Sequence, residues 1–488
     1  MPATVSDPGR LPSPPIDRNQ APISATTLFV LAGLLIPCLV AFSLATQNPF
    51  VVTLWMAEIA LLLIAMARPF WGLLLLVGLI YIRPEEMDPS LAGLHLTLAV
   101  SVVTLISTWF QFFLDRQRVT RSPQITAIFA FSIVVLINAF LTGAYISQTL
   151  ENMVRLTILV LLILNLVRTP GRYRAYVNTL ILFTAYVAVY SLILYATGID
   201  VLHQGDETNA GSIIERSVAT GIFGDPNDLA VTLVAGLALA LAVLMQVRGL
   251  TRLPYLAVLG LGSFAVLQTN SRSGMLAFLV VVVTGFICLS RRKAVAIGLV
   301  IVVVGGLLTV ASSRMTDFNT QEASANERFT FWSNGLDQLR QHPLTGCGYE
   351  KFTDYNDHRA AHNTFVLCFA ELGLPGYLCF IGLIYYAFRR RPSGADWTLD
   401  ERSARDLLAA RLALIGYLTG SFFLTRTYIP VTYLYITLPV AAQIALSGQT
   451  EPVRLTSRER LRDFGWVTAI SLGSILLIRL LVYRGAGL

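Results

Sequence analysis

Long apolar runs are the feature that most restricts how this chain can fold. A helix needs about 20 mainly apolar residues to cross the ~30 Å hydrocarbon layer of a membrane. Fifteen candidate stretches follow one another: 27–45, 49–67, 70–83, 92–114, 124–142, 152–168, 175–197, 227–247, 253–268, 273–290, 294–311, 363–388, 407–424, 428–446 and 465–483. The third is short, so twelve to fifteen spans are expected. The sequence therefore predicts an all-α polytopic membrane protein.

The composition excludes the other broad classes. Only 13% of the 488 residues are charged and 55% are hydrophobic, whereas soluble domains carry about 25% charged residues. Intrinsic disorder is excluded because such a chain can bury ample apolar surface. The five scattered cysteines form neither a disulfide framework nor a CxxC metal site.

The positions of the basic residues predict an orientation. If the N-terminus is cytoplasmic and fifteen spans alternate, 24 of the 36 Lys and Arg residues lie at inner ends. Cytoplasmic loops are enriched in basic residues, and the opposite orientation would invert the ratio. A cytoplasmic N-terminus is therefore expected.

Two long loops then lie on the outer face, at 198–226 and 312–361. The second loop contains a helical pattern, in which apolar residues recur at Phe329, Trp332, Leu336 and Leu339. We expect a helix that begins at a cap on Asn326, ends at His342-Pro343, and lies along the membrane surface or covers a cavity.

Several kinds of chemistry lack their usual motifs. The chain has no Asp-x-Asp pair, no GxxxxGK[ST] phosphate loop and no HExxH helix. Its five histidines, at 95, 203, 342, 358 and 362, are not spaced as a metal cluster. We therefore expect no metal, no cofactor and no nucleotide-driven reaction.

Polar residues collect instead at the outer ends of the predicted spans. Arg216 precedes Thr220–Ala230, a turn in which Asp225 can cap the next helix and Pro226 suits its first turn. Arg272 lies in the polar stretch Gln268–Gly274 between two spans. Arg328 and Trp332 belong to the loop helix, and His362-Asn363 directly precedes a span that contains Glu371.

Each of these residues has an ordinary structural interpretation. A single arginine near a span end is most often an anchor at the membrane surface, but such anchors are expected mainly on the inner face. Arg216, Arg272 and Arg328 are all on the outer face, and three guanidinium groups suit a diphosphate. His362 is either a helix cap or a general base, and its position beside Asn363 and the arginines favours a base.

Carboxylates inside a membrane are costly and need an explanation. Glu371 is expected to be ion-paired or functional, about 13 Å below His362 along the helix. Glu58 and Arg155 raise the same question and are interpreted as structural.

Five motifs in order carry a resemblance to a known family. They are Thr220–Ala230, Ser271–Gly274, Glu327 to Trp332, Pro343–Tyr349, and Ala361–Phe365 with Glu371–Gly376. Together they resemble the O-antigen ligase and O-antigen polymerase superfamily over roughly residues 210–390. The stretches 67–72 and 81–88 are similar to its O-glycosylation ligase-like subset.

The resemblance implies a metal-independent membrane glycosyltransferase of the GT-C type. Such enzymes take a glycan from undecaprenyl diphosphate at the periplasmic face of the bacterial inner membrane. They pass it to a hydroxyl of lipid A core, of the next lipid-linked repeat or of a protein. Arg272, Arg328 and Arg216 resemble the arginines that hold the diphosphate, and His362 resembles the base.

These implications define four expected regions and a working mechanism. Residues 1–26 form a cytoplasmic tail, 27–197 an N-terminal membrane region, 198–390 the catalytic core with the loop 312–361, and 391–488 a C-terminal membrane region. Arg272, Arg328 and Arg216 hold the donor, and His362 activates the acceptor with inversion. Asn363, Trp332 and Glu371 support the site. The expected partners are the lipid bilayer, the donor and the acceptor, and no nucleic acid.

Two alternative functions are a polytopic transporter of a small ion or solute and a non-catalytic scaffold in polysaccharide export. Transport favours ionisable residues near the middle of the membrane. Here the polar groups concentrate at the outer end, which favours the enzyme.

Overall fold

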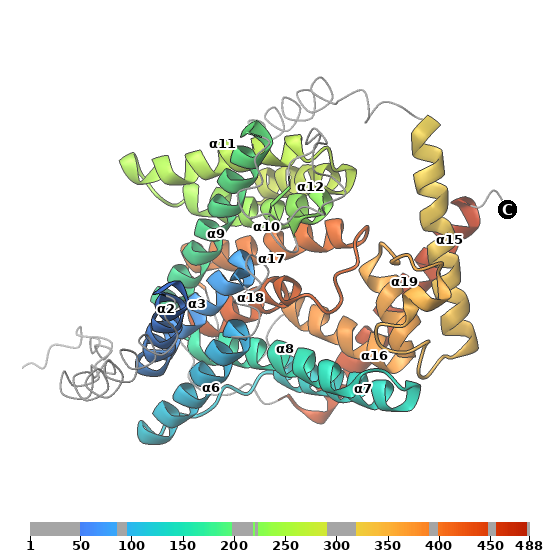
Figure 1. The fold of residues 1–488 in the computed structure, drawn as a ribbon, viewed down its shortest axis with the longest axis horizontal. Coiled ribbons are helices and arrows are strands. Elements are labelled where there is room, and N and C mark those ends of the chain that lie inside the picture. Colours follow the sequence, from blue (N-terminus) through green and yellow to red (C-terminus); the bar gives the residue numbers. More distant parts are fainter. Residues whose placement is uncertain are drawn as a thin grey trace, which may run out of the picture.

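The computed structural model describes residues 49–84, 95–197, 218–219, 223–289, 319–389, 399–447 and 455–485 (Figure 1). The regular elements in these ranges are helices, and the ranges contain no strand. The expected tail 1–26, the predicted spans 27–45 and 294–311, and Arg216 lie outside the described residues. The α-helices are α2 (Pro49–Ala67), α3 (Pro69–Ile82), α6 (Leu96–Leu114), α7 (Pro123–Thr142), α8 (Ile146–Leu166), α9 (Pro170–Thr197), α10 (Pro226–Leu244), α11 (Leu253–Gln268), α12 (Arg272–Leu289), α15 (Asn319–Gln341), α16 (Thr364–Phe388), α17 (Glu401–Ser421), α18 (Pro430–Leu446) and α19 (Ser457–Gly485).

The described helices confirm a polytopic membrane protein. Eight of them are long and apolar enough to cross a membrane: α6, α7, α8, α9, α10, α11 with its preceding turn, α16 and α19. Shorter apolar helices lie within α2, α3, α12 and α18. Every predicted span that falls in the described ranges coincides with a helix. The apolar pattern was therefore sufficient to find these elements.

Helix α10 packs against α9, α11, α12 and α17. Its contact with α17 depends on glycine: a Cβ added to Gly420 would lie 2.1 Å from Cγ2 of Val231 on α10. One turn earlier, a Cβ on Gly416 would lie 2.4 Å from Val281 of α12. Small residues four positions apart let membrane helices approach closely, and this spacing brings α17 onto both α10 and α12.

Helix α15 is the predicted loop helix, but it starts earlier than expected. It begins at Asn319, so Asn326 lies inside the helix and the predicted cap is wrong. The preceding Gln, Glu and Ala residues have high helix propensity and extend the helix backwards. Its end at Gln341, before Pro343, agrees with the prediction. The helix packs against α16 and α19, and its side chains Trp332 and Leu339 are buried.

Helix α16 is interrupted after its second turn. Gly373 has a φ of 63° and Pro375 follows it within the helix, so the carbonyl groups of Ala370 and Glu371 lose their usual helical partners. The glycine turn after α15 takes their place. Cys347 N–H donates to the Ala370 carbonyl over 2.8 Å, and Gly348 N–H donates to the Glu371 carbonyl over 3.0 Å.

This docking requires glycine at position 346. Gly346 has a φ of 61°, and a Cβ there would lie 2.3 Å from the Ala370 carbonyl oxygen. A left-handed conformation and a close backbone approach are both conditions that favour glycine. The Gly346-Cys-Gly348 motif therefore holds the loop against the kink of α16.

Candidate functional site

His362 lies in the loop directly before α16. Its φ of 46° is left-handed, and its backbone N–H donates to Oγ1 of Thr425 over 3.1 Å. The half-buried imidazole lies beside the ring of Phe331, with 6.3 Å between the ring centroids. The next residue, Asn363, is fully buried, and its Oδ1 accepts from the N–H groups of Phe365 and Val366. Asn363 thus caps α16 and fixes the backbone that presents His362.

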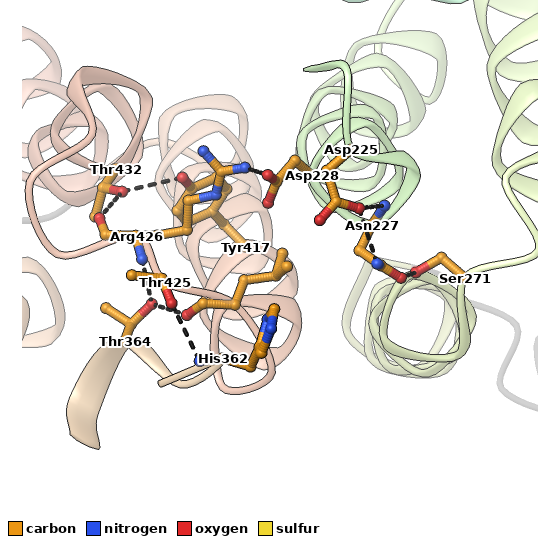
Figure 2. Close-up of polar contacts among 11 residues, drawn as sticks. Asp225, Asn227, Asp228, Ser271, His362, Thr364, Tyr417, Thr425, Arg426 and Thr432 are labelled. Carbon is orange, nitrogen blue, oxygen red and sulfur yellow. Dashed lines mark hydrogen bonds and ion pairs between the residues drawn. The ribbon is translucent and has the colours of Figure 1, made fainter. Parts of the chain in front are cut away.

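The α17–α18 loop, residues 422–429, is tied to the same point. Thr364 Oγ1 donates to the Leu424 carbonyl over 2.6 Å and accepts from the N–H of Arg426 over 3.0 Å (Figure 2). Thr427 Oγ1 donates to the Thr364 carbonyl over 2.9 Å. These bonds give the loop and the start of α16 one fixed arrangement.

Arg426 is a site residue that the sequence analysis missed. It is 6% exposed, and its guanidinium forms an ion pair with Asp228 in the first turn of α10 (Figure 2). Its carbonyl accepts from Thr432 Oγ1 over 2.7 Å. Burial lowers the pKa of Arg426 to about 9, so the side chain keeps its charge at neutral pH. The sequence does contain a feature that could have indicated it: Arg426 lies between two threonines in the short turn that joins the predicted spans 407–424 and 428–446 at their outer ends.

The starts of α10 and α12 are joined by a chain of hydrogen bonds. Asp225 Oδ1 accepts from both the backbone N–H and the side-chain Nδ2 of Asn227, each over 2.8 Å. Ser271 Oγ donates to Asn227 Oδ1 over 2.7 Å (Figure 2). The predicted cap at Asp225 and the first-turn position of Pro226 are confirmed. Arg272 follows Ser271 as the exposed first residue of α12.

Arg328 on α15 links these elements through its charge. Burial and the charge of Arg272 lower the pKa of Arg328. The carboxylate of Asp225 acts in the opposite direction, but the net effect is a lowered pKa. The guanidinium carbon lies 5.9 Å from the ring centroid of Phe423 in the α17–α18 loop. Two of the three predicted arginines therefore lie within electrostatic range of each other, and the third, Arg216, is outside the described residues.

The same charges act on the imidazole of His362. Burial is the largest influence and lowers its pKa below the usual 6.5. Arg328 and Arg359 lower the pKa further because they repel a protonated ring, whereas Asp225 and Glu327 raise it. The net effect is a neutral imidazole at neutral pH, which is the form that accepts a proton.

Trp332 connects α15 to the α17–α18 loop by aromatic packing. Its ring meets Phe422 edge to face with 5.4 Å between centroids, and it meets Phe329 in the same way at 5.6 Å. The indole is 3% exposed, and its N–H has no hydrogen-bond acceptor within the described part of the chain. Trp332 therefore holds the helix that carries Arg328 against the loop that carries Arg426.

Glu371 is buried at 2% exposure and holds the loops behind the site. Its Oε2 accepts from the Tyr428 hydroxyl over 2.9 Å, and its Oε1 accepts from the Phe352 N–H over 3.3 Å. Tyr428 belongs to the same loop as Arg426. Glu371 thus supports the arrangement from about two turns inside α16, through Tyr428 and Phe352.

The other charged residues singled out from the sequence lie elsewhere. Arg155 on α8 pairs with Glu151 four residues earlier on the same helix, and Glu58 is buried in α2. Within the described ranges, no three His, Cys, Asp or Glu side chains gather closely enough to hold a metal ion.

The pair of Arg426 and Asp228 predicts a large effect on stability. Asp228→Ala removes the ion-pair partner of a buried guanidinium, and removal of one partner of a buried pair costs about 3–5 kcal/mol. The charge of Asp225, which also acts on Arg426, remains. We expect a clear fall in the melting temperature of the detergent-solubilised protein. Glu401→Ala, which removes an exposed partner of Arg405 on α17, should change it little. Equal melting temperatures for the two variants would contradict a structural role for the buried pair.

Comparison with known proteins adds independent information. A protein-family profile described as O-antigen ligase matches residues 255–381. The comparisons with curated proteins and with solved structures found no match. The matched segment contains Arg272, Arg328, His362 and Glu371, and the rest of the chain supplies Asp225, Asp228 and Arg426. Residues 255–381 are thus similar to the O-antigen ligase family, and they lie in a bundle of helices that are long and apolar enough to cross a membrane.

Proposed function

We propose that this protein is a glycosyltransferase that moves a glycan from undecaprenyl diphosphate to an acceptor hydroxyl at the periplasmic face of the bacterial inner membrane. One observation carries the proposal: α15 places Phe331 beside the ring of His362, with 6.3 Å between centroids, and it places Arg328 5.9 Å from the ring of Phe423 in the loop that is bonded to His362. The charges of Arg272 and Arg328 act on each other, and that of Arg328 acts on the imidazole. A cationic pair beside a neutral imidazole matches the two requirements of the reaction, which are a stabilised leaving group and a base.

The arginines act on the leaving group. When the bond between the anomeric carbon and the phosphate oxygen breaks, negative charge builds on the diphosphate. Guanidinium groups donate two parallel hydrogen bonds to phosphate oxygens, and donors that are already in place stabilise such charge more strongly in a site with little water. Arg272 and Arg328 come from the start of α12 and from α15, so they can approach the diphosphate from two sides.

His362 acts on the acceptor. Its neutral imidazole removes the proton of the attacking hydroxyl as the new glycosidic bond forms. Attack opposite to the departing diphosphate inverts the anomeric centre. The bond from the His362 N–H to Thr425 and the cap at Asn363 hold the ring in place, and the pair of Arg426 and Asp228 fixes that loop against α10. The glycosyl diphosphate supplies the energy.

The charges around His362 predict the pH dependence of the rate. Because its pKa is lowered from the usual 6.5, the rate should fall at a lower pH than it would with an unperturbed imidazole as the base. Asp225→Asn removes a carboxylate that raises the pKa of His362. The acid limb of the profile, where the rate falls at low pH, should therefore move to lower pH. Arg359→Gln removes an exposed cation that lowers the pKa, so the limb should move to higher pH. The measurement is the transfer rate against pH, and shifts in the same direction for both variants would contradict the assignment.

Glycan analysis of a deletion strain tests the donor and separates the possible acceptors. Loss of the enzyme should cause lipid-linked glycan to accumulate. Single repeats on the lipid would identify a polymerase, and full-length chains would identify a ligase that acts on lipid A core or on protein. An unchanged pool of lipid-linked glycan would overturn the proposed donor.

A further inference from the structure

A second site lies at the end of the bundle opposite to His362. A groove of about 1060 Å³ runs between α7, α16 and α19. The residues of α16 that line it run from Leu378 to Tyr386, beyond the kink at Gly373, whereas His362 precedes the start of the helix. The groove is therefore separate from the candidate catalytic site.

The rim of the groove is cationic and polar. Arg121 and Arg460 line it together with the hydroxyl residues Thr120 and Ser122, and no Asp or Glu lines it among the residues that the structure describes. Both arginines are exposed. Helix α7 begins at this rim, capped by Ser122, so the positive end of its dipole also faces an occupant of the groove.

The floor of the groove is apolar and runs along the helices. It includes Ile125 and Ala130 of α7, Leu378 of α16 and Val467 of α19. From Pro123 to Ala130 the wall extends about 10 Å at the usual helical rise. The groove thus leads from a charged rim into the apolar zone for about two helical turns.

Gly382 shows that the floor contains unfilled space. It lies in the middle of α16 and lines the groove, yet a Cβ built on it would meet no atom within 4 Å. Glycine weakens a helix by about 1 kcal/mol relative to alanine, so a larger residue would be favoured here if the space were simply empty. The missing side chain leaves room for an apolar chain.

We propose that this groove binds one anionic phospholipid, with its phosphate between Arg121 and Arg460 and an acyl chain over Gly382. The charge of the rim complements a phosphate diester with a net negative charge, and the groove is long enough for the upper part of an acyl chain. The bound lipid fills the space between α7 and α19. At this end the fully buried Asp463 of α19 pairs with Arg389 at 2.6 Å and accepts from the Tyr385 hydroxyl over 3.0 Å.

The test uses purified full-length protein, phosphatidylglycerol and phosphatidylcholine with identical chains, and native mass spectrometry. The wild-type protein should retain one phosphatidylglycerol at detergent concentrations that remove phosphatidylcholine. Arg121→Gln/Arg460→Gln should reduce retention of phosphatidylglycerol at least tenfold. The matched control, Arg116→Gln/Arg458→Gln, removes two exposed arginines that do not line the groove and should retain the lipid.

Gly382→Leu tests the apolar part of the site. The leucine enters the open space and improves helix propensity, so the variant should fold but lose the bound lipid. Equal loss of phosphatidylglycerol in both double variants would show general attraction to a basic surface and overturn the site. Full retention by Gly382→Leu would also overturn it. Glycan transfer is not measured in either experiment, so failure of the lipid site and failure of the proposed function are distinguishable.

Discussion

Replacement of His362 by alanine is expected to reduce the rate of glycan transfer by about 10²–10⁴-fold, the usual contribution of a positioned general base. The helix start survives the change because the cap of α16 comes from the Asn363 side chain and the bond to Thr425 comes from the His362 backbone. The protein should therefore accumulate and melt normally. The measurement is the initial rate of transfer from a purified lipid diphosphate donor.

His358 provides a matched control for this experiment. It lies four residues earlier in the same loop, and its side chain is exposed. His358→Ala should leave the rate within twofold of the wild type. A normal rate for His362→Ala, or equal losses for both variants, would remove the assignment of His362 as the base.

Replacement of Arg328 by alanine is expected to reduce the rate by about 10²–10³-fold, which is typical for the loss of one donor that stabilises developing negative charge. The variant also removes a cation that lowers the pKa of His362, so the acid limb of the pH profile should move to higher pH. Arg328→Lys keeps the charge but loses the two-pronged hydrogen bonding of arginine. Compared with Arg328→Ala, the Arg328→Lys variant should therefore have a pH profile close to that of the wild type but a rate that is still reduced.

Arg340 is the matched control on the same helix. It is exposed in the last turn of α15, and Arg340→Ala should leave both the rate and the pH profile unchanged. The two effects of Arg328 have different origins. A loss of rate without a shift of the acid limb would contradict the influence of the Arg328 charge on His362. A shift without a loss would contradict the role of Arg328 in donor binding.

Local signals in the chain were sufficient for many parts of the site. Asp225-Pro226 has the residue types of a helix start, and the structure shows that cap. His342-Pro343 marks the end of α15 because proline cannot continue a helix. The start of the same helix was misplaced at Asn326, since a cap residue can also be tolerated inside a helix when its neighbours favour helix.

Arg426 could not be assigned from such signals. Its partner, Asp228, is 198 positions earlier in the chain, and they meet because the loop after α17 reaches the start of α10. Glu371 shows the same limit. The sequence indicated that a carboxylate inside the membrane needs a partner, but only the folded chain shows that the Tyr428 hydroxyl and the Phe352 N–H supply the hydrogen bonds.

The sequence by itself determined that this chain forms apolar helices in a membrane, because the length and polarity of each run are local properties that a bilayer selects directly. It also indicated which helix ends carry the chemically capable residues. Only the tertiary structure decided that Arg272, Arg328, Asp225 and His362 influence one another and that Arg426 joins them. The physical reason is that electrostatic and hydrogen-bond partners depend on separation in space, which the packing of α10, α12, α15 and α16 sets.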